Sequence, residues 1–260
     1  MIRYLTPRMG VEFLNLGYWP VQREVIDEDF LEDEEIEALI NTHSTDSISD
    51  SKKSHLFIYE KTLSQHPSYP NMAKIDLLEV GCGMGNGLKW INTTRQEIGR
   101  CIGIDKVPPV NIPFVYYGDA ENLHFMRNSF DLVLNIESSH LYKNMTSFLN
   151  ECFRVLRPGG FLCWADVRFP IEIIDLHRQA KNTGFELVNF KDITSNVIEG
   201  IHHTSQFYDS LINKLPFFLK PFTTSLRSTY CAPGTTTYQR LQKRERVYLL
   251  AMWKKPFNRE

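Results

Sequence analysis

Residues 77–87 read LLEVGCGMGNG, and this stretch decides the fold. The apolar start predicts a buried strand. The glycines predict a turn into a helix that brings backbone N–H groups close to a nucleotide-like ligand. A dinucleotide-binding fingerprint requires glycine at positions 81, 83 and 86, but this chain has Asn86 and carries its third glycine as Gly85. Glu79 lies two residues before Gly81, and a carboxylate repels phosphate whereas it attracts a cation.

This pattern favours a positively charged nucleoside cofactor over NAD, and S-adenosylmethionine is the candidate. A tight strand–helix turn without a ligand competes with that interpretation as long as the motif is taken by itself. Two further acids follow predicted strands. Residues 100–104 form an apolar run that ends at Asp105, where a doubly wound fold binds a ribose diol. Residues 114–117 precede a turn with Asp119, which is suited to an adenine amino group.

The rest of the core alternates strands and helices. Further strands are predicted at 129–136, 161–165 and 185–193, and a last one, antiparallel to its neighbour, at 248–253. Helices are predicted at 148–160, stopped by Pro158 and the glycines after it, and at 171–182, closed by Gly184. Such alternation predicts a parallel sheet with helices on both faces.

In succession, the motifs resemble those of the class I S-adenosylmethionine-dependent methyltransferases over roughly residues 76–168. They are E-x-G-x-G-x-G, the strand-tip Asp105, G-D-A-E-N-L-x-F, S-F-D-L-V and R-V-L-R-P-G-G. N-L-G-Y-W at 15–19, E-S-S-H at 137–140 and D-I-T-S-N-V at 192–197 resemble small-molecule O-methyltransferases of polyketide-derived lipids or glycosides, including phthiotriolone-type enzymes. His124 departs from the family, which usually has proline there, and this loosens one turn.

The resemblance implies an α/β fold of the Rossmann-like methyltransferase type. We expect a doubly wound, mostly parallel seven-stranded sheet with helices on both faces, an N-terminal helical lid and an insertion before the last strand. The cofactor would be S-adenosylmethionine. The residues expected to bind it are Tyr18, Glu79, Gly81, Cys82, Gly83, Gly85, Asp105, Lys106, Gly118, Asp119, Ala120, Asn135, Ile136 and Glu137.

His140 and Asp166 are the candidate catalytic pair. His140 directly follows the strand predicted at 129–136, and Asp166 ends the next one, so both fall at the carboxyl edge of the sheet where ligands bind. Histidine is the natural base near neutral pH, and a carboxylate beside it orients the imidazole and stabilises its protonated form. Some O-methyltransferases that this chain resembles use such a pair. The alternative is that His140 caps a turn and Asp166 begins a helix.

Composition excludes several classes of function. The formal net charge of −2 creates no field that attracts nucleic acid. The five cysteines lack metal-type spacing, so no metal is expected, and they fit free thiols in a reducing compartment. No secretory signal and no run near the ~20 apolar residues of a membrane span is found. We therefore expect a soluble cytoplasmic protein that acts on a small-molecule acceptor; the sequence does not indicate its oligomeric state.

The expected organisation is an N-terminal helical lid at 1–70 and a methyltransferase domain at 71–260. Within the lid segment, residues 27–38 and 55–65 predict helices and 42–53 a mobile loop. Tyr18 and Trp19 are either core aromatics or part of a lid over the cofactor. The insertion at about 195–247 contains LPFFLKPF at 215–222, which either folds over the core or lines a pocket for an apolar acceptor.

The function predicted from these observations is methyl transfer to a hydroxyl group of an apolar small molecule, assisted by His140 and Asp166. Two alternatives remain open. In the first, the acceptor is an amine, and replacing His140 with alanine then leaves turnover largely intact. In the second, the chain is a non-catalytic module that binds the cofactor.

Overall fold

The computed structural model describes residues 11–21, 28–44, 48–110, 112–214 and 221–257. The chain divides into two compact units. Of the described residues, those within 62–192 and 247–257 form one unit, and those within 11–61 and 193–246 form the other. The N-terminal segment and the insertion, which the sequence separates widely, thus belong to the same unit.

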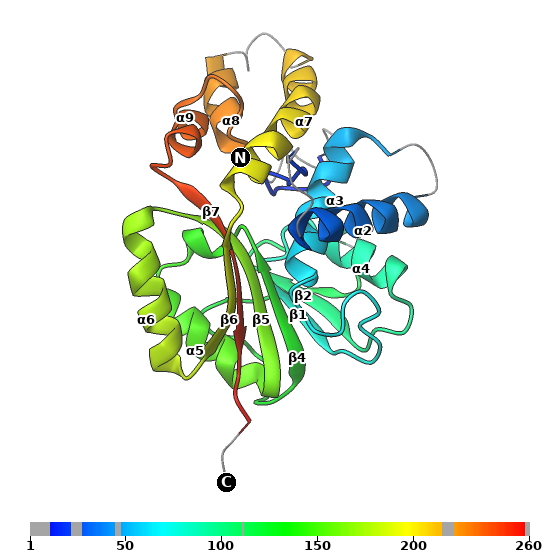
Figure 1. The fold of residues 1–260 in the computed structure, drawn as a ribbon, viewed down its shortest axis with the longest axis vertical. Helices are drawn as coiled ribbons and strands as arrows, with labels where there is room; N and C mark the ends of the chain where they lie inside the picture. Colours follow the sequence, from blue (N-terminus) through cyan, green and yellow to red (C-terminus); the bar gives the residue numbers. More distant parts are fainter. Residues whose placement is uncertain (1–10, 22–27, 45–47, 111, 215–220, 258–260) are drawn as a thin grey trace. The chain divides into compact units, whose positions relative to one another are not determined.

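The larger unit is built on a seven-stranded sheet in the order β3-β2-β1-β4-β5-β7-β6 (Figure 1). Its strands are β1 (Leu77–Val80), β2 (Cys101–Asp105), β3 (Val115–Tyr117), β4 (Phe130–Ile136), β5 (Leu156–Arg168), β6 (Glu186–Asp192) and β7 (Val247–Lys254). The first five strands pair in parallel, whereas β7 runs antiparallel to both β5 and β6. The predicted sheet and its antiparallel last strand are confirmed.

β2 and β3 lie on one side of β1, and β4, the next strand in the sequence, lies on its other side. The order of strands therefore reverses between β1 and β4, and ligands of open α/β sheets bind at such a switch point, outside the carboxyl ends of the strands. β1 is buried along its whole length, as expected for a central parallel strand.

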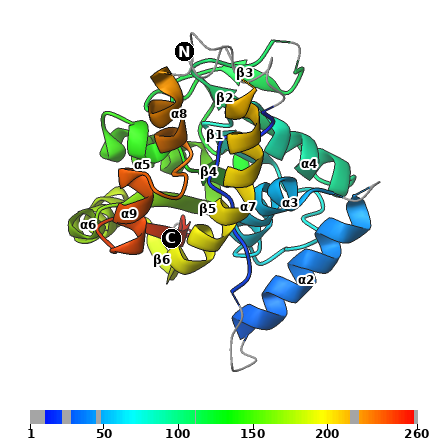
Figure 2. The ribbon, with the colours of Figure 1, turned by 90° about the horizontal axis from the view of Figure 1, so that it is seen from above.

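Helices cover both faces of this sheet (Figure 2). They are α4 (Asn86–Thr94), α5 (Met145–Val155) and α6 (Ile173–Thr183), with the short 3₁₀ helices η2 (Ser139–Leu141) and η3 (Pro170–Glu172). Asn144 caps the N-terminus of α5, and its side chain accepts a hydrogen bond from the N–H of Ser147. α6 ends at Gly184 with φ 106°, the left-handed C-cap that glycine favours, as predicted. Phe148 of α5 and Trp164 of β5 are fully buried in one apolar cluster.

One helix boundary was predicted wrongly. The helix expected to stop at Pro158 ends at Val155, and β5 begins directly at Leu156, where the turn with Gly159 and Gly160 was expected. The N–H of Gly159 donates to the carbonyl of Lys255, the residue after β7. This pairing makes residues 157–160 part of β5 instead of a turn. At its other end β5 continues to Arg168 by pairing with β7, so Asp166 lies inside the strand and does not begin a helix.

The smaller unit is helical. It contains α2 (Glu28–His43), the start of α3 (Asp50–Leu63), α7 (Thr194–Asn213), α8 (Thr223–Thr229) and α9 (Thr236–Gln242). The helix predicted at 55–65 is confirmed, but it starts earlier, at Asp50, so the loop expected at 42–53 is shorter. Residues 45–47 of that loop lie outside the described residues. The same holds for residues 215–220 of the apolar segment in the insertion.

The N-terminal segment, residues 11–21, bonds to both α3 and α7 through its backbone. The N–H of Tyr18 donates to the Ser54 carbonyl, and the N–H of Trp19 donates to the Asn196 carbonyl. A Cβ on Gly200 would approach the backbone nitrogen of Tyr18 to 2.6 Å, so glycine is what allows α7 to come this close. These contacts explain why the two distant segments form one unit.

Candidate active site

The glycine turn after β1 has the shape that the sequence predicts. Gly81 has φ 75° and Gly85, the N-cap of α4, has φ 73°. Residues other than glycine rarely adopt such values. A Cβ on Gly81 would lie 2.4 Å from Ser138 Oγ and 2.8 Å from Tyr142 Oη. Because no larger residue fits, the backbone of this turn stays close to the end of β4. Glu79 is buried in β1 just before the turn.

Asp105, at the end of β2, holds the turn from the other side. Its Oδ2 accepts a hydrogen bond from the Gly83 N–H at 3.0 Å, and its Oδ1 accepts one from the Val107 N–H at 2.8 Å. The carboxylate is almost fully buried. The residue expected to bind a ribose thus also fixes the geometry of the glycine turn.

Lys106 and Asp119 form an ion pair beyond the ends of β2 and β3. Lys106 Nζ lies 3.1 Å from Asp119 Oδ2, and both side chains are exposed. A hydrogen bond from the Glu121 N–H lowers the pKa of Asp119, against a smaller effect of burial, and Lys106 lowers it further. Gly118 and the buried Ala120 flank this acid. Asp119 is therefore ionised near neutral pH and accessible to a ligand.

Asn135 connects β4 to the end of β1. Its Nδ2 donates to the Val80 carbonyl at 2.8 Å and contacts Ser138 Oγ at 2.8 Å and Tyr142 Oη at 3.0 Å. Its Oδ1 is buried and has no hydrogen-bond partner among the described residues. Leaving a buried acceptor unpaired costs about 1–3 kcal/mol. A ligand that donates a hydrogen bond would remove this cost.

These residues fit S-adenosylmethionine. The Oδ1 atom of Asn135 offers an unused acceptor beside the glycine turn, and the buried Glu79 and Asp105 match a cationic nucleoside. Of the remaining predicted residues, Ile136 and Cys82 are buried, the latter against Gly103. Tyr18 belongs to the helical unit, where its hydroxyl donates to the Asp33 carboxylate at 2.8 Å. The role of Tyr18 towards the cofactor stays a prediction.

Glu137 follows β4 in an unusual backbone conformation. Its φ is 48°, which is uncommon for a residue with a side chain and occurs often at functional sites. Its N–H donates to the Ala165 carbonyl at 2.7 Å. Its carboxylate accepts a hydrogen bond at 3.0 Å from the hydroxyl of Tyr248, a fully buried residue of β7. Glu137 is thereby held at the carboxyl edge of the sheet.

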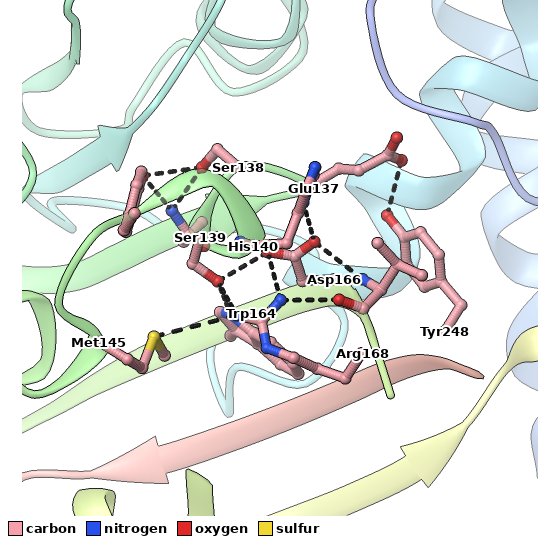
Figure 3. Close-up of polar contacts among 12 residues, drawn as sticks. Glu137, Ser138, Ser139, His140, Met145, Trp164, Asp166, Arg168 and Tyr248 are labelled. Carbon is pink, nitrogen blue, oxygen red and sulfur yellow. Dashed lines mark hydrogen bonds and ion pairs between the residues drawn. The ribbon is translucent and has the colours of Figure 1, made fainter. Parts of the chain in front are cut away.

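The predicted pair of His140 and Asp166 is present (Figure 3). His140 Nδ1 lies 2.7 Å from Asp166 Oδ1, and the His140 backbone N–H donates to Asp166 Oδ2 at 2.9 Å. Asp166 is fully buried, whereas the His140 side chain is 26% exposed. The carboxylate also accepts hydrogen bonds from the Ser139 hydroxyl at 2.6 Å and from the Val167 N–H at 2.8 Å. His140 lies in η2 directly after β4, so the strand-tip prediction is correct for its position.

The network determines where the protons lie. Burial alone would raise the pKa of Asp166, but hydrogen bonds from His140 and Ser139 and the positive charge of Arg168 lower it overall. Because this ionised carboxylate only accepts, His140 Nδ1 carries a proton and Nε2 bears the lone pair when the ring is neutral. Burial lowers the pKa of His140, but the Asp166 hydrogen bond and charge outweigh it and raise the pKa above its usual value.

Four residues around this pair were not assigned a role from the sequence: Ser139, Trp164, Arg168 and Tyr248. A signal for two of them was present. Trp164 and Arg168 flank Asp166 at a spacing of two, which places all three side chains on one face of a strand.

Within the described part of the chain, no group of three His, Cys, Asp or Glu side chains is arranged to hold a metal ion. Nor do the same residues include a helix with the length and apolar character needed to cross a membrane.

Comparison with known proteins identifies the family. Residues 78–164 match the family described as Methyltransferase domain. A phthiotriol/phenolphthiotriol dimycocerosates methyltransferase from Mycobacterium leprae is 34% identical over 180 residues, which cover 65% of this chain and 64% of that protein. A fatty-acid O-methyltransferase from Mycolicibacterium smegmatis is 29% identical over 191 residues, covering 69% of this chain and 68% of that protein. The chain therefore belongs to the class I S-adenosylmethionine-dependent methyltransferases, as its motifs indicated.

The fold agrees with this assignment. The crystal structure of the [4+2]-cyclase SpnF superposes with a TM-score of 0.69 at 17% identity, covering 99% of this chain and 95% of that one. This likeness concerns the fold alone. The chain spans 64% of the length of the phthiotriol relatives from Mycobacterium leprae and Mycobacterium tuberculosis.

Proposed function

We propose that this chain transfers the methyl group of S-adenosylmethionine to a hydroxyl group of an apolar, lipid- or polyketide-like small molecule. The observation that carries the proposal is the pairing of His140 with the buried Asp166 at the carboxyl edge of the sheet. A partly exposed imidazole whose Nε2 has no hydrogen-bond partner among the described residues can act as a general base.

The cofactor would supply an electrophilic methyl group on a sulfonium ion. The glycine turn and Asn135 would hold its amino-acid part, Asp105 its ribose and Asp119 its adenine. Glu79, buried beside the turn, would favour the positive charge of the cofactor over a pyrophosphate. The protein would chiefly align the acceptor with the methyl group, because alignment accounts for much of the acceleration of such displacements.

His140 would remove the acceptor proton. When the methyl group passes from the sulfonium sulfur to the acceptor oxygen, the S–C bond would break and S-adenosylhomocysteine would be left. The acceptor's hydroxyl proton would move to His140 Nε2, and the ring would become an imidazolium. Asp166 stabilises that cation through the Nδ1 hydrogen bond and keeps the ring in one orientation. The proton leaves to solvent through the exposed part of the side chain, which restores the base.

Charge favours a neutral acceptor over a carboxylate. Glu137 and Asp166 are both negative beside His140, and Arg168 is already bonded to Asp166 and Ser139. An anionic acceptor would meet like charges there. The names of the relatives support a lipid-like acceptor; the fatty-acid enzyme differs from the present proposal in the group that it methylates.

A panel of acceptors tests the proposal. Wild-type protein is incubated with S-adenosylmethionine carrying a deuterated methyl group and with a long-chain alcohol, a fatty acid or an alkylamine, and the products are measured by mass spectrometry. We expect a labelled ether from the alcohol. His140→Gln should lower this rate by roughly 10²–10⁴-fold because the general base is lost, whereas His43→Gln, at an exposed position of α2, should not.

Two results would contradict the proposal. If the alkylamine is methylated and His140→Gln retains the rate, the chain is an N-methyltransferase. If S-adenosylmethionine binds but no acceptor gains a methyl group, the chain is a cofactor-binding module.

A further inference from the structure

Three side chains of β5 converge on the hydroxyl of Ser139 (Figure 3). Trp164, Asp166 and Arg168 share one face of the strand, because side chains alternate between its two faces. Ser139 Oγ lies 2.8 Å from Trp164 Nε1, 2.6 Å from Asp166 Oδ2 and 2.5 Å from an Arg168 Nη atom. All four residues are buried.

The direction of each hydrogen bond in this cluster is determined. The indole and guanidinium groups only donate, so they occupy the two acceptor sites of the Ser139 oxygen. The single Ser139 proton must then point to Asp166. The hydroxyl has no hydrogen-bonding capacity left. Since Arg168 and Trp164 fix the position of its oxygen, they also fix the hydrogen bond that it donates to the carboxylate of Asp166.

Arg168 also reaches Asp166 directly. Its Nη1 lies 3.2 Å from Asp166 Oδ2, its side chain is 7% exposed, and its guanidinium stacks over the Trp164 ring at 5.0 Å. A buried cation requires a partner of opposite charge. The one carboxylate of Asp166 therefore serves two cationic groups, the guanidinium of Arg168 and the imidazolium form of His140.

We propose that Arg168 is a positioning residue: with Ser139 it holds Asp166 ionised and correctly oriented, and by sharing this carboxylate it prevents His140 from retaining its proton too tightly. As far as catalysis is concerned, the inference rests on the proposed function. His140 is then oriented by Asp166, and because Arg168 shares that carboxylate, the imidazolium still releases its proton after each methyl transfer.

The charges that face His140 agree with this role. Burial lowers the pKa of His140, Asp166 of β5 and Glu137 at the end of β4 raise it, and the positive charge of Arg168 lowers it. Glu137 is itself held by Tyr248 of β7. Arg168 is thus the group that opposes the two carboxylates.

The test is the titration of His140 in variants of Arg168. The imidazole is followed by NMR with ¹⁵N-labelled histidine, and His140→Gln assigns its signal. In Arg168→Met, which removes the charge and keeps the aliphatic stem, we expect His140 to titrate at higher pH than in wild type. Arg168→Lys, which restores the charge, should move the titration back towards wild type. Arg178→Met, at an exposed arginine of α6 that also pairs with an aspartate, should leave it unchanged.

Activity provides the second measurement. We compare kcat/KM of Arg168→Met with that of wild type at each pH. The loss relative to wild type should be roughly threefold to tenfold larger on the acid side of the profile than on the alkaline plateau. A merely structural arginine would lower activity equally at every pH. If Arg168→Met does not fold, Ser139→Ala replaces it: loss of one hydrogen bond to Asp166 should also move the His140 titration upward.

An unchanged or lower His140 titration in the folded variants would overturn the inference. This outcome is separate from failure of the proposed function, because the NMR titration requires no turnover. If the titration shifts but no acceptor is methylated, the coupling of Arg168 to His140 stands and the proposed function is wrong.

Discussion

Gly81→Ala tests the glycine turn most severely. An alanine there must adopt φ near 75°, which costs about 1–2 kcal/mol for a residue with a Cβ. Its methyl group would also lie 2.4 Å from Ser138 Oγ and 2.8 Å from Tyr142 Oη. These atoms are hydrogen-bonded to each other at 2.9 Å and to Asn135, so the clash disrupts a buried network worth about 1–3 kcal/mol.

The expected loss in the free energy of unfolding is therefore roughly 2–5 kcal/mol in total. Affinity for S-adenosylmethionine should fall as well, because the turn and Asn135 Oδ1 move together. A loss of about 1.4 kcal/mol already weakens binding tenfold. Urea unfolding followed by circular dichroism measures the stability, and isothermal titration calorimetry measures the affinity.

Gly234→Ala is the matched control. Gly234 has φ 86°, but a Cβ built there meets nothing within 4 Å, so only the backbone cost of about 1–2 kcal/mol applies. Its affinity for S-adenosylmethionine should equal that of wild type. The reasoning is refuted if Gly81→Ala unfolds like Gly234→Ala and binds the cofactor with wild-type affinity.

Three further predictions concern the acids and the base. Asp166→Asn leaves the buried Arg168 without a counter-charge, so urea unfolding should show a loss of roughly 3–5 kcal/mol; a loss within experimental error would contradict the buried pair. Asp105→Ala removes the acceptor of the Gly83 N–H, and calorimetry should show affinity for S-adenosylmethionine weakened roughly tenfold or more; unaltered affinity would exclude this role. Because the pKa of His140 is raised, kcat/KM should fall as pH decreases through a value above 6.5, where the base becomes protonated. The stability of the fold should change in the opposite direction. The contribution of the protonated ring to the free energy of unfolding is complete below pH 6.5 and is lost as pH rises through the raised pKa. A rate independent of pH across this range would argue against His140 as the base.

The sheet was predictable because its strands are apolar runs with clear ends. β1 and β2 each lead into glycine or aspartate at the carboxyl edge, and their predicted limits agree with the structure within a residue or two. The end of α5 was misplaced for a non-local reason. Residues 157–160 contain a proline and two glycines, which predict a helix stop and a turn, and the contact of Gly159 with Lys255 that extends β5 instead leaves no trace in the local sequence.

The positions of the candidate pair in the fold were predictable to the same extent. His140 and Asp166 follow from the rule that ligands bind at the ends of neighbouring parallel strands. The role of Arg168 was not predicted. Its spacing of two from Asp166 places both side chains on one face of the strand, but its burial also depends on Ser139, which belongs to another element. The grouping of Tyr18 with α7 depends likewise on contacts between segments far apart in the chain.

The central claim is that an acid-flanked glycine turn binds a sulfonium nucleoside and not a dinucleotide. Isothermal titration calorimetry of the purified chain against S-adenosylmethionine, S-adenosylhomocysteine and NAD tests it directly. We predict saturable binding of the first two, one molecule per chain, and none of NAD. Saturable binding of NAD with no heat from either adenosyl compound would contradict the account.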